Sequence, residues 1–383
     1  MRFVRRKLAG TARGSRADRL HVGFVPTLDC ATLMVAQELG LFARHGVQVR
    51  LSREVGWATV REKLVHEELD AAATHASMLF SIYCGLGVVR RPCLTGLFLG
   101  ANGSAITLSD ALWNEGARDA ATTAAAIRKR GPGRPATFGI VLGLSTQHLA
   151  LRRWLASGGL DPERDVKIVI IPSGLIYESF RQGFIDGYCV AEPWNSAAIR
   201  DRLGWVAATS SDILPGHPEK ALVVLQDFAE RREEEHLRMI AALMEASRFC
   251  DDPANRPEVV RILARPAWFD LDPACLRNAL VGPFDSGRGH AGGFGEVIRY
   301  DAFDIGAPSR SRGRQVLDMV NELHPQGDAR PFHADIIGKL FRHDIYNQAR
   351  ALADPNAASG VAPARCAAVP EFSAGLLPAP QAA

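Results

Sequence analysis

A cysteine and a histidine in the amino-terminal part of the chain are residue types that can form a nucleophilic pair. Cys30 lies between the apolar stretch 21–26 and a helical apolar pattern at 31–40, so we expect it where a strand ends and a helix begins. A helix start lowers the pKa of a thiol, and a histidine can accept the thiol proton. His75 ends a second predicted strand, so a Cys30–His75 pair would define a cysteine-dependent enzyme. The alternative is that Cys30 is a small buried residue behind a ligand.

Other sequence signatures of catalysis or metal binding are missing. The seven cysteines are scattered, without CxxC spacing or histidines at metal-ligand spacing, which favours a reducing compartment. The glycine-rich run 287–295 lacks the strand, helix and lysine of a phosphate-binding loop. No GxSxG or HExxH motif occurs. The sequence therefore predicts neither a metal nor a cofactor.

The charge of the chain is concentrated at its amino end. The 383 residues are 47% hydrophobic and 23% charged, which is typical of a globular protein of about two domains. The net charge is +3, but residues 1–20 carry about +6, so the rest of the chain carries about −3. This distribution predicts no direct binding of nucleic acid by the folded body.

Apolar stretches of strand length alternate with helical patterns, which favours an α/β fold with largely parallel sheets. We expect Asp29 and Ser145 to cap the helices that follow them. The stretches 93–100 and 104–109 read as two strands joined by an Asn102-Gly103 turn, followed by one alanine-rich helix. Such an arrangement predicts two lobes with a ligand cleft between them. Further strands and helices are expected at 47–51, 57–69, 70–76, 77–85, 136–142, 145–159, 167–173, 188–194, 195–204, 205–209, 221–225 and from 229 to about 350.

Five stretches carry a family resemblance. They are, in order, GFVPTLDCATLMVAQELGLFARHGVQV, GWATVREKLV, LRRWLASGGLDPERDVKIVIIP, DGYCVAEPWNSAAIRDRLGW and HPEKA. Taken together they resemble the nitrate/bicarbonate-binding family of periplasmic-binding-like proteins. The family contains ABC-transporter solute receptors and a cytosolic nitrate sensor. The resemblance implies a type II periplasmic-binding-protein-like fold in which residues 21–108 and 212–350 form one lobe and 109–211 the other. Residues 1–20 and 351–383 are then a basic arm and an Ala/Pro-rich tail, both predicted to be disordered.

The resemblance also implies an anion site. By position in the family motifs, its ligand-binding residues are Trp57, Ser104, Gln147, Ala191 and Lys220, with Lys220 as the cationic anchor. Ser104, Gln147 and Ala191 differ from the residues of the nitrate receptors at these positions. The resemblance implies that the anion is nitrate or nitrite. Because these three positions differ, bicarbonate is the alternative.

Three further residues are secondary candidates for the same site. His148 follows Gln147 in the first turn of one helix, so one of the two is expected to face the ligand. Cys30 is included because it lies where the first predicted strand is followed by a helix, and His75 because it lies at the end of a neighbouring predicted strand.

The start of the chain favours one branch of the family. Its basic residues are not followed by the 7–15 apolar residues of a secretory signal, which predicts a cytoplasmic location. The sequence contains no apolar run of about 18 residues, so it predicts no membrane span. We therefore expect a cytosolic nitrate sensor that holds an RNA-binding, response-regulator-like antiterminator until the anion binds. The alternatives are the solute-binding component of a nitrate/bicarbonate ABC transporter and a cysteine-dependent enzyme on the same fold.

Overall fold

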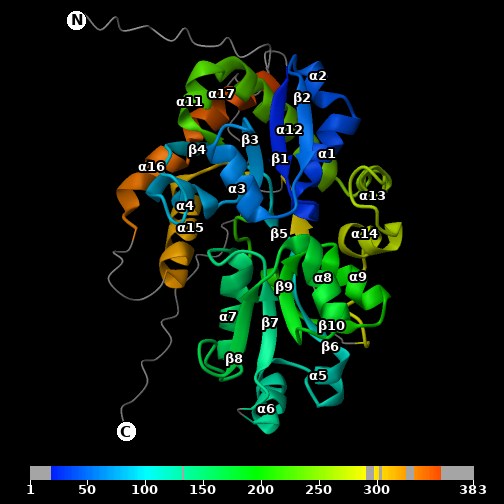
Figure 1. The fold of residues 1–383 in the computed structure, drawn as a ribbon. Helices are drawn as coiled ribbons and strands as arrows, with labels where there is room; N and C mark the ends of the chain where they lie inside the picture. The colour runs from blue at the N-terminus through cyan, green and yellow to red at the C-terminus, as the bar shows by residue number, and fades with distance from the viewer. Residues whose placement is uncertain (1–18, 132, 290–296, 302–303, 325–331, 355–383) are drawn as a thin grey trace, which may run out of the picture.

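Two five-stranded mixed sheets, one above the other in Figure 1, organise the protein. The computed structural model describes residues 19–131, 133–289, 297–301, 304–324 and 332–354. The expected α/β class is confirmed, but the expectation of largely parallel sheets is wrong, because each five-stranded sheet has two parallel and two antiparallel strand pairings. The predicted arm and tail fall mostly on residues 1–18 and 355–383, which lie outside the described residues, as does most of the glycine-rich run.

The first sheet combines amino-terminal strands with one strand from much later in the chain. Its order is β2-β1-β3-β11-β4, with β1 parallel to β2 and β3, and β11 antiparallel to both of its neighbours. The register of β11 against β3 pairs Lys220 directly with His75. The strands are β1 (Leu20–Phe24), β2 (Val49–Arg53), β3 (Ala71–His75), β4 (Cys93–Phe98) and β11 (Lys220–Leu225).

The second sheet is built from the middle of the chain. Its order is β10-β6-β9-β7-β8, and the register of β6 against β9 pairs Ser104 with Ala191. Its strands are β6 (Ser104–Ser109), β7 (Ala136–Ile140), β8 (Val166–Ile170), β9 (Gly187–Ala191) and β10 (Gly204–Thr209). A two-stranded ribbon of β5 (Ala101–Asn102) and β12 (Ile298–Arg299) completes the strands of the described residues.

The two strands expected on either side of the Asn102-Gly103 turn are present, but they do not pair with each other. β4 pairs with β11 in the first sheet, whereas β6 pairs with β9 and β10 in the second. Asn102 and Gly103, with φ of 62° and 96°, therefore lie where the chain crosses between the sheets. The local turn signal was real, but the strands on its two sides pair with different partners.

Helices cover both sheets, and two of the expected helical features differ. The single alanine-rich helix is two helices, separated by Gly116 at φ 103° and restarted by a capping box at Asp119. The helices are α1 (Ala31–Glu38), α2 (Leu41–Arg44), α3 (Trp57–Val65), α4 (Met78–Cys84), α5 (Asp110–Asn114), α6 (Ala120–Arg130), α7 (Thr146–Ser157), α8 (Ser173–Arg181), α9 (Trp194–Arg200), α10 (Ser210–Ile213), α11 (Gln226–Arg231), α12 (Glu233–Asp251), α13 (Arg256–Leu263), α14 (Pro273–Leu280), α15 (Arg310–Leu323), α16 (Ile337–Leu340) and α17 (His343–Ala353), with short 3-10 turns at Leu28–Cys30 and Ala334–Ile336. Because α17 extends to Ala353, the predicted tail begins too early at residue 351.

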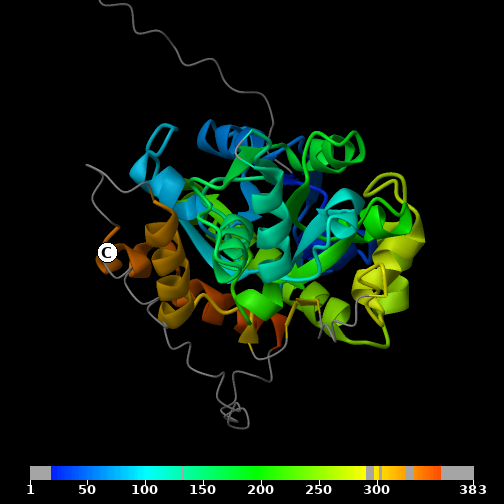
Figure 2. The ribbon, with the colours of Figure 1, turned by 90° about the horizontal axis from the view of Figure 1, so that it is seen from below.

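The carboxy-terminal helices reach the second sheet on two opposite sides. In Figures 1 and 2, α15 lies on the side of α7, and α14 lies on the other side, against α9. Arg153 of α7 pairs with Glu322 of α15 at 2.6 Å, and Arg200 at the end of α9 pairs with Asp272 at 3.1 Å. Among the residues that the structure describes, no helix has the length and apolarity needed to cross a membrane.

Candidate functional site

A fully buried lysine lies where the two sheets face each other. Lys220 is the first residue of β11, and its Nζ lies 2.7 Å from Asp29 Oδ2 and 2.8 Å from Glu219 Oε1. All three side chains are 0–1% exposed. Burial opposes the charge of Lys220, but Asp29 and Glu219 more than offset this and raise its pKa above the usual value. The ammonium is thus held as a paired buried charge.

Glu219 is the centre of the polar contacts around Lys220. Burial raises the pKa of its carboxyl group, but Lys220 and two histidines outweigh burial and hold the pKa well below its usual value. Each carboxylate oxygen accepts from several groups. The contacts are Lys220 Nζ at 2.8 Å, His75 Nδ1 at 3.1 Å and Gln147 Nε2 at 3.3 Å on Oε1, and His217 Nε2 at 3.2 Å and the Thr146 hydroxyl on Oε2. We call these residues, together with Asp29, Ser104 and Trp57, the interlobe network.

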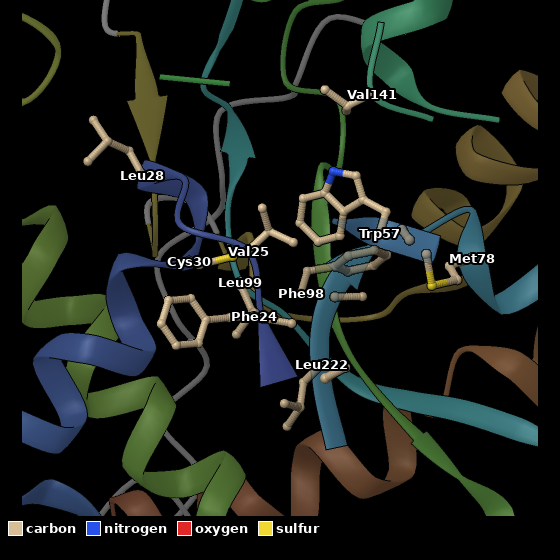
Figure 3. Packing of buried hydrophobic residues seen from close by; sticks show 14 of the residues in the cluster. Phe24, Val25, Leu28, Cys30, Trp57, Met78, Phe98, Leu99, Val141 and Leu222 are labelled. Carbon is tan, nitrogen blue, oxygen red and sulfur yellow. The ribbon is translucent and has the colours of Figure 1, made fainter. Parts of the chain in front are cut away.

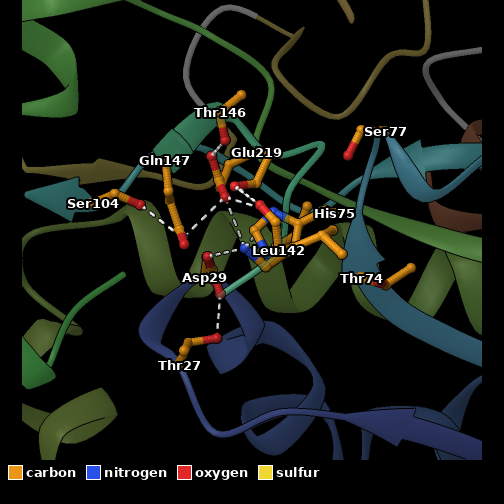
Figure 4. Close-up of polar contacts among 12 residues, drawn as sticks. Thr27, Asp29, Thr74, His75, Ser77, Ser104, Leu142, Thr146, Gln147 and Glu219 are labelled. Atoms are coloured by element: carbon orange, nitrogen blue, oxygen red, sulfur yellow. Dashed lines mark hydrogen bonds and ion pairs between the residues drawn. The ribbon is translucent and has the colours of Figure 1, made fainter. Parts of the chain in front are cut away.

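The interlobe network joins the two sheets. In Figure 4, Asp29 approaches Glu219 from one side, and Thr146 and Gln147 approach it from the other. Gln147 also donates from Nε2 to Ser104 Oγ, 3.1 Å away at the start of β6. Ser145 caps α7 by accepting from the His148 backbone N–H, as predicted, and this cap fixes the first turn that carries Thr146 and Gln147.

Trp57 forms an apolar wall beside the lysine. It begins α3, is 2% exposed, and its ring centre lies 5.0 Å from Lys220 Nζ. The ring meets His75 edge to face, with 4.6 Å between the ring centres. Figure 3 shows the indole nitrogen pointing toward Val141, which follows β7 in the second sheet. The indole N–H therefore faces the second sheet.

Apart from Asp29 Oδ2, which forms the ion pair with Lys220, three buried polar atoms of the interlobe network have no hydrogen-bond partner among the described residues. They are Trp57 Nε1, His75 Nε2 and Gln147 Oε1, on side chains that are 1–2% exposed. Buried polar atoms are almost always hydrogen-bonded in proteins. Their clustering around one paired lysine is the property expected of a ligand site.

The structure brings together all five residues that the family resemblance selects. Trp57, Lys220, Gln147 and Ser104 are linked by the contacts above, and Ala191 lies beside Ser104 in the register of β6 and β9. The roles of these residues as ligand contacts stay a prediction.

His148 lies apart from these contacts. Its Nδ1 lies 2.6 Å from the Gly143 carbonyl oxygen, which directs the ring away from Glu219. Gln147 is thus the residue of this helical turn that contacts the network.

Of the two interpretations of Cys30, the structure favours the small buried residue over the activated nucleophile. Its thiol is buried between Thr27 Oγ1 at 3.7 Å and Asp29 Oδ1 at 3.6 Å. Burial, reinforced by the Asp29 carboxylate, raises the thiol pKa well above its usual value despite the nearby Lys220. At neutral pH the group is a thiol, which is a poor nucleophile.

The two carboxylates of the network are functional candidates that the sequence interpretation missed. Asp29 does not cap α1, for which Cys30 is the N-cap residue; its side chain pairs with Lys220 instead. Glu219 immediately precedes Lys220 in the sequence, and this adjacency could have identified Glu219 as a candidate. The described residues contain no group of three or more His, Cys, Asp or Glu side chains arranged to hold a metal.

The two mixed sheets and the helices around them give this chain the fold of the periplasmic-binding-protein class. The crystal structure of the periplasmic nitrate-binding protein NrtA from Synechocystis PCC 6803 matches this fold with a TM-score of 0.81, covering 88% of this chain and 89% of that one at 23% identity.

The chain belongs to the NMT1-like family, whose model matches residues 13–264, and within it to the nitrate/bicarbonate substrate-binding group. It is 38% identical over 350 residues to the bicarbonate transport ATP-binding protein CmpC of Synechococcus elongatus, covering 90% of this chain and 51% of that protein. It is 33% identical over 343 residues to the nitrate import ATP-binding protein NrtC of Synechocystis, covering 88% of this chain and 50% of that protein. The chain thus spans about half the length of these relatives.

Proposed function

We propose that this chain binds a small planar oxyanion of the nitrate and bicarbonate class between its two lobes and does not transform it chemically. The observation that carries the proposal is the buried Lys220, with the unpartnered N–H of Trp57 beside it. The names of the relatives, which refer to nitrate and bicarbonate, support the same class of ligand.

In this proposal each of the five residues has a physical role. Lys220 supplies a compact charge whose hydrogen bonds to an oxyanion are the strong, charge-assisted kind. Trp57 supplies an N–H donor and excludes water with its ring. Gln147 and Ser104 supply uncharged polar groups that can hydrogen-bond to the ligand. The small side chain of Ala191 lets the β9 backbone approach the ligand.

The two lobes act as units in this proposal. The predicted boundary at residues 108 and 109 is moved to 103 and 104, because β6 (Ser104–Ser109) lies in the second sheet, so the lobes are 21–103 plus 212–350 and 104–211. Contacts such as that of Thr146 with Glu219 connect one lobe to the other. An anion can shift the arrangement of the lobes only by the difference in its affinity for the open and closed arrangements. Residues of both lobes must therefore contact the ligand.

Isothermal titration calorimetry with nitrate, nitrite and hydrogen carbonate tests the binding. We expect at least one of these anions to bind the wild-type protein, and Trp57→Phe, which keeps an aromatic ring but lacks the N–H, to weaken that binding. Lys220→Met should abolish it, whereas Lys63→Met, at a partly exposed lysine paired with Glu54, should not change it. If none of the three anions binds, or if Lys220→Met binds as tightly as wild type, the proposal is wrong.

The biological role that the resemblance implies is a separate proposal, which depends on the anion binding proposed above. We propose a cytoplasmic sensor of the bound anion, whichever member of the nitrate and bicarbonate class it is, that holds an RNA-binding, response-regulator-like antiterminator and releases it when the anion binds. Affinity purification of the full chain with and without anion, together with cell fractionation, tests this role. Recovery of the antiterminator only without anion supports the sensor; recovery of a membrane permease, as for a transporter component, contradicts it.

A further inference from the structure

The tautomer of His75 leaves a hydrogen-bond acceptor without a donor. His75 Nδ1 lies 3.1 Å from Glu219 Oε1, which as a carboxylate oxygen can only accept, so Nδ1 carries the proton. The approach of Lys220 Nζ to the same nitrogen is longer, at 3.5 Å. Burial, with Lys220 nearby, lowers the pKa of His75, so the ring is neutral and Nε2 holds a lone pair. No donor to Nε2 exists among the described residues.

Gln147 presents a second acceptor of the same kind. Its amide nitrogen donates both of its hydrogens, one to Ser104 Oγ at 3.1 Å and one to Glu219 Oε1 at 3.3 Å. The opposite orientation of the amide would set its oxygen against the Glu219 carboxylate, which is repulsive. Gln147 Oε1 is therefore an acceptor, and it has no partner within the described part of the chain.

The donors that remain are the Trp57 N–H, the Ser104 hydroxyl hydrogen and the third hydrogen of the Lys220 ammonium, whose other two face Asp29 and Glu219. The network therefore offers both donors and acceptors to a ligand. It also already contains two carboxylates against one ammonium. A ligand that only accepts hydrogen bonds would satisfy Trp57 and Lys220 but would leave His75 and Gln147 unmet.

From this inventory we infer that the site selects an oxyanion that carries an O–H donor, hydrogen carbonate, over nitrate. The inference rests on the proposed function and narrows its ligand. Both anions are planar, singly charged and have three oxygens, so size and charge do not separate them. Hydrogen carbonate accepts from Lys220 and Trp57 and donates its hydroxyl hydrogen to His75 Nε2 or Gln147 Oε1. A site built to accept a ligand hydroxyl rejects the analogue that lacks it, because its own buried groups are then left unpaired.

Paired calorimetric titrations at pH 8 test the inference, with sodium hydrogen carbonate in a sealed cell and sodium nitrate as the two probes. We expect hydrogen carbonate to bind about 10- to 100-fold more tightly than nitrate, since one buried polar group goes unpaired in the nitrate complex. If neither anion binds, the proposed function fails. If nitrate binds as tightly as hydrogen carbonate or more tightly, only this inference fails.

Two variants locate the acceptors. His75→Phe and Gln147→Met each remove one acceptor at similar volume, and at least one of them should reduce the ratio of the two dissociation constants about tenfold. A variant that weakens the binding of both anions equally leaves the ratio of their dissociation constants unchanged, so the ratio reports selectivity alone. The second variant keeps the test informative if the first does not fold. His236→Phe is the matched control, since His236 is also a buried histidine with an unpartnered Nε2 but lies on α12. An unchanged ratio in both variants, or an equal change in the control, would overturn the assignment.

Discussion

Replacing Lys220 by methionine should destabilise the protein strongly even when no ligand is present. Methionine keeps most of the apolar stem of the lysine, so the loss of packing is small. The change removes the one ammonium between Asp29 and Glu219, whose side chains are 0–1% exposed. Two buried carboxylates then face each other without a cation.

The magnitude follows from the burial of all three groups. Removing one partner of a buried ion pair costs about 3–5 kcal/mol, because the remaining charge is left uncompensated. Here two carboxylates are left, so we expect a loss of about 5 kcal/mol in the free energy of unfolding at pH 7. This is a large fraction of the total stability of a typical protein.

Urea denaturation followed by circular dichroism measures the loss, with Lys63→Met as the control. Lys63 forms an ion pair of 2.8 Å with Glu54, which is itself buried. This variant leaves one carboxylate, which still accepts a hydrogen bond from Ser52, in place of two, so we expect a smaller loss of about 1–3 kcal/mol. The triple variant Asp29→Asn, Glu219→Gln, Lys220→Met replaces the charges by neutral groups of similar size and should recover at least about 2 kcal/mol. If Lys220→Met costs no more than Lys63→Met, the ion-paired network does not stabilise the fold as argued.

Three further predictions concern single residues. Burial raises the pKa of Glu192 from its usual 4.5 to about 7, so the folded state loses stability as the pH rises from 4.5 to 7. Glu192→Gln should therefore add about 3 kcal/mol to the free energy of unfolding above pH 7 and almost nothing below pH 4.5. A gain in stability that does not depend on pH would contradict this. Trp57→Phe should weaken binding of the preferred anion about tenfold by calorimetry because the indole N–H is lost, and unchanged affinity would remove Trp57 from the site. Because burial and Asp29 raise the thiol pKa of Cys30, iodoacetamide at pH 8 should leave Cys30 of the native protein unmodified in peptide mass spectra, and rapid labelling would reopen the enzyme alternative.

The α/β class and many of the elements could be predicted because they depend on local apolar periodicity. The Ser145 cap is such a case, since a capping residue and the helix after it are adjacent in sequence. The crossing at Asn102-Gly103 could not be predicted in this way, because which strands pair depends on partners far along the chain. β11 illustrates the same limit, since it joins a sheet whose other strands lie more than 120 residues earlier.

The positions of the candidate site residues were accessible through the family motifs, but their electrostatic setting was not. Lys220 could be selected from HPEKA, whereas its pairing with Asp29 joins residues far apart in sequence. The effect of Asp29 on Cys30 depends on the same three-dimensional proximity, which is why a rule about helix starts gave the wrong sign for the thiol pKa.

A crystal structure of the protein grown with hydrogen carbonate, and a second grown with nitrate, tests the central claim most directly. The account predicts a flat, three-oxygen density within hydrogen-bond distance of Lys220 Nζ and Trp57 Nε1, reached by residues of both lobes. Density for the anion at another place, with Lys220 still enclosed only by Asp29 and Glu219, would contradict it.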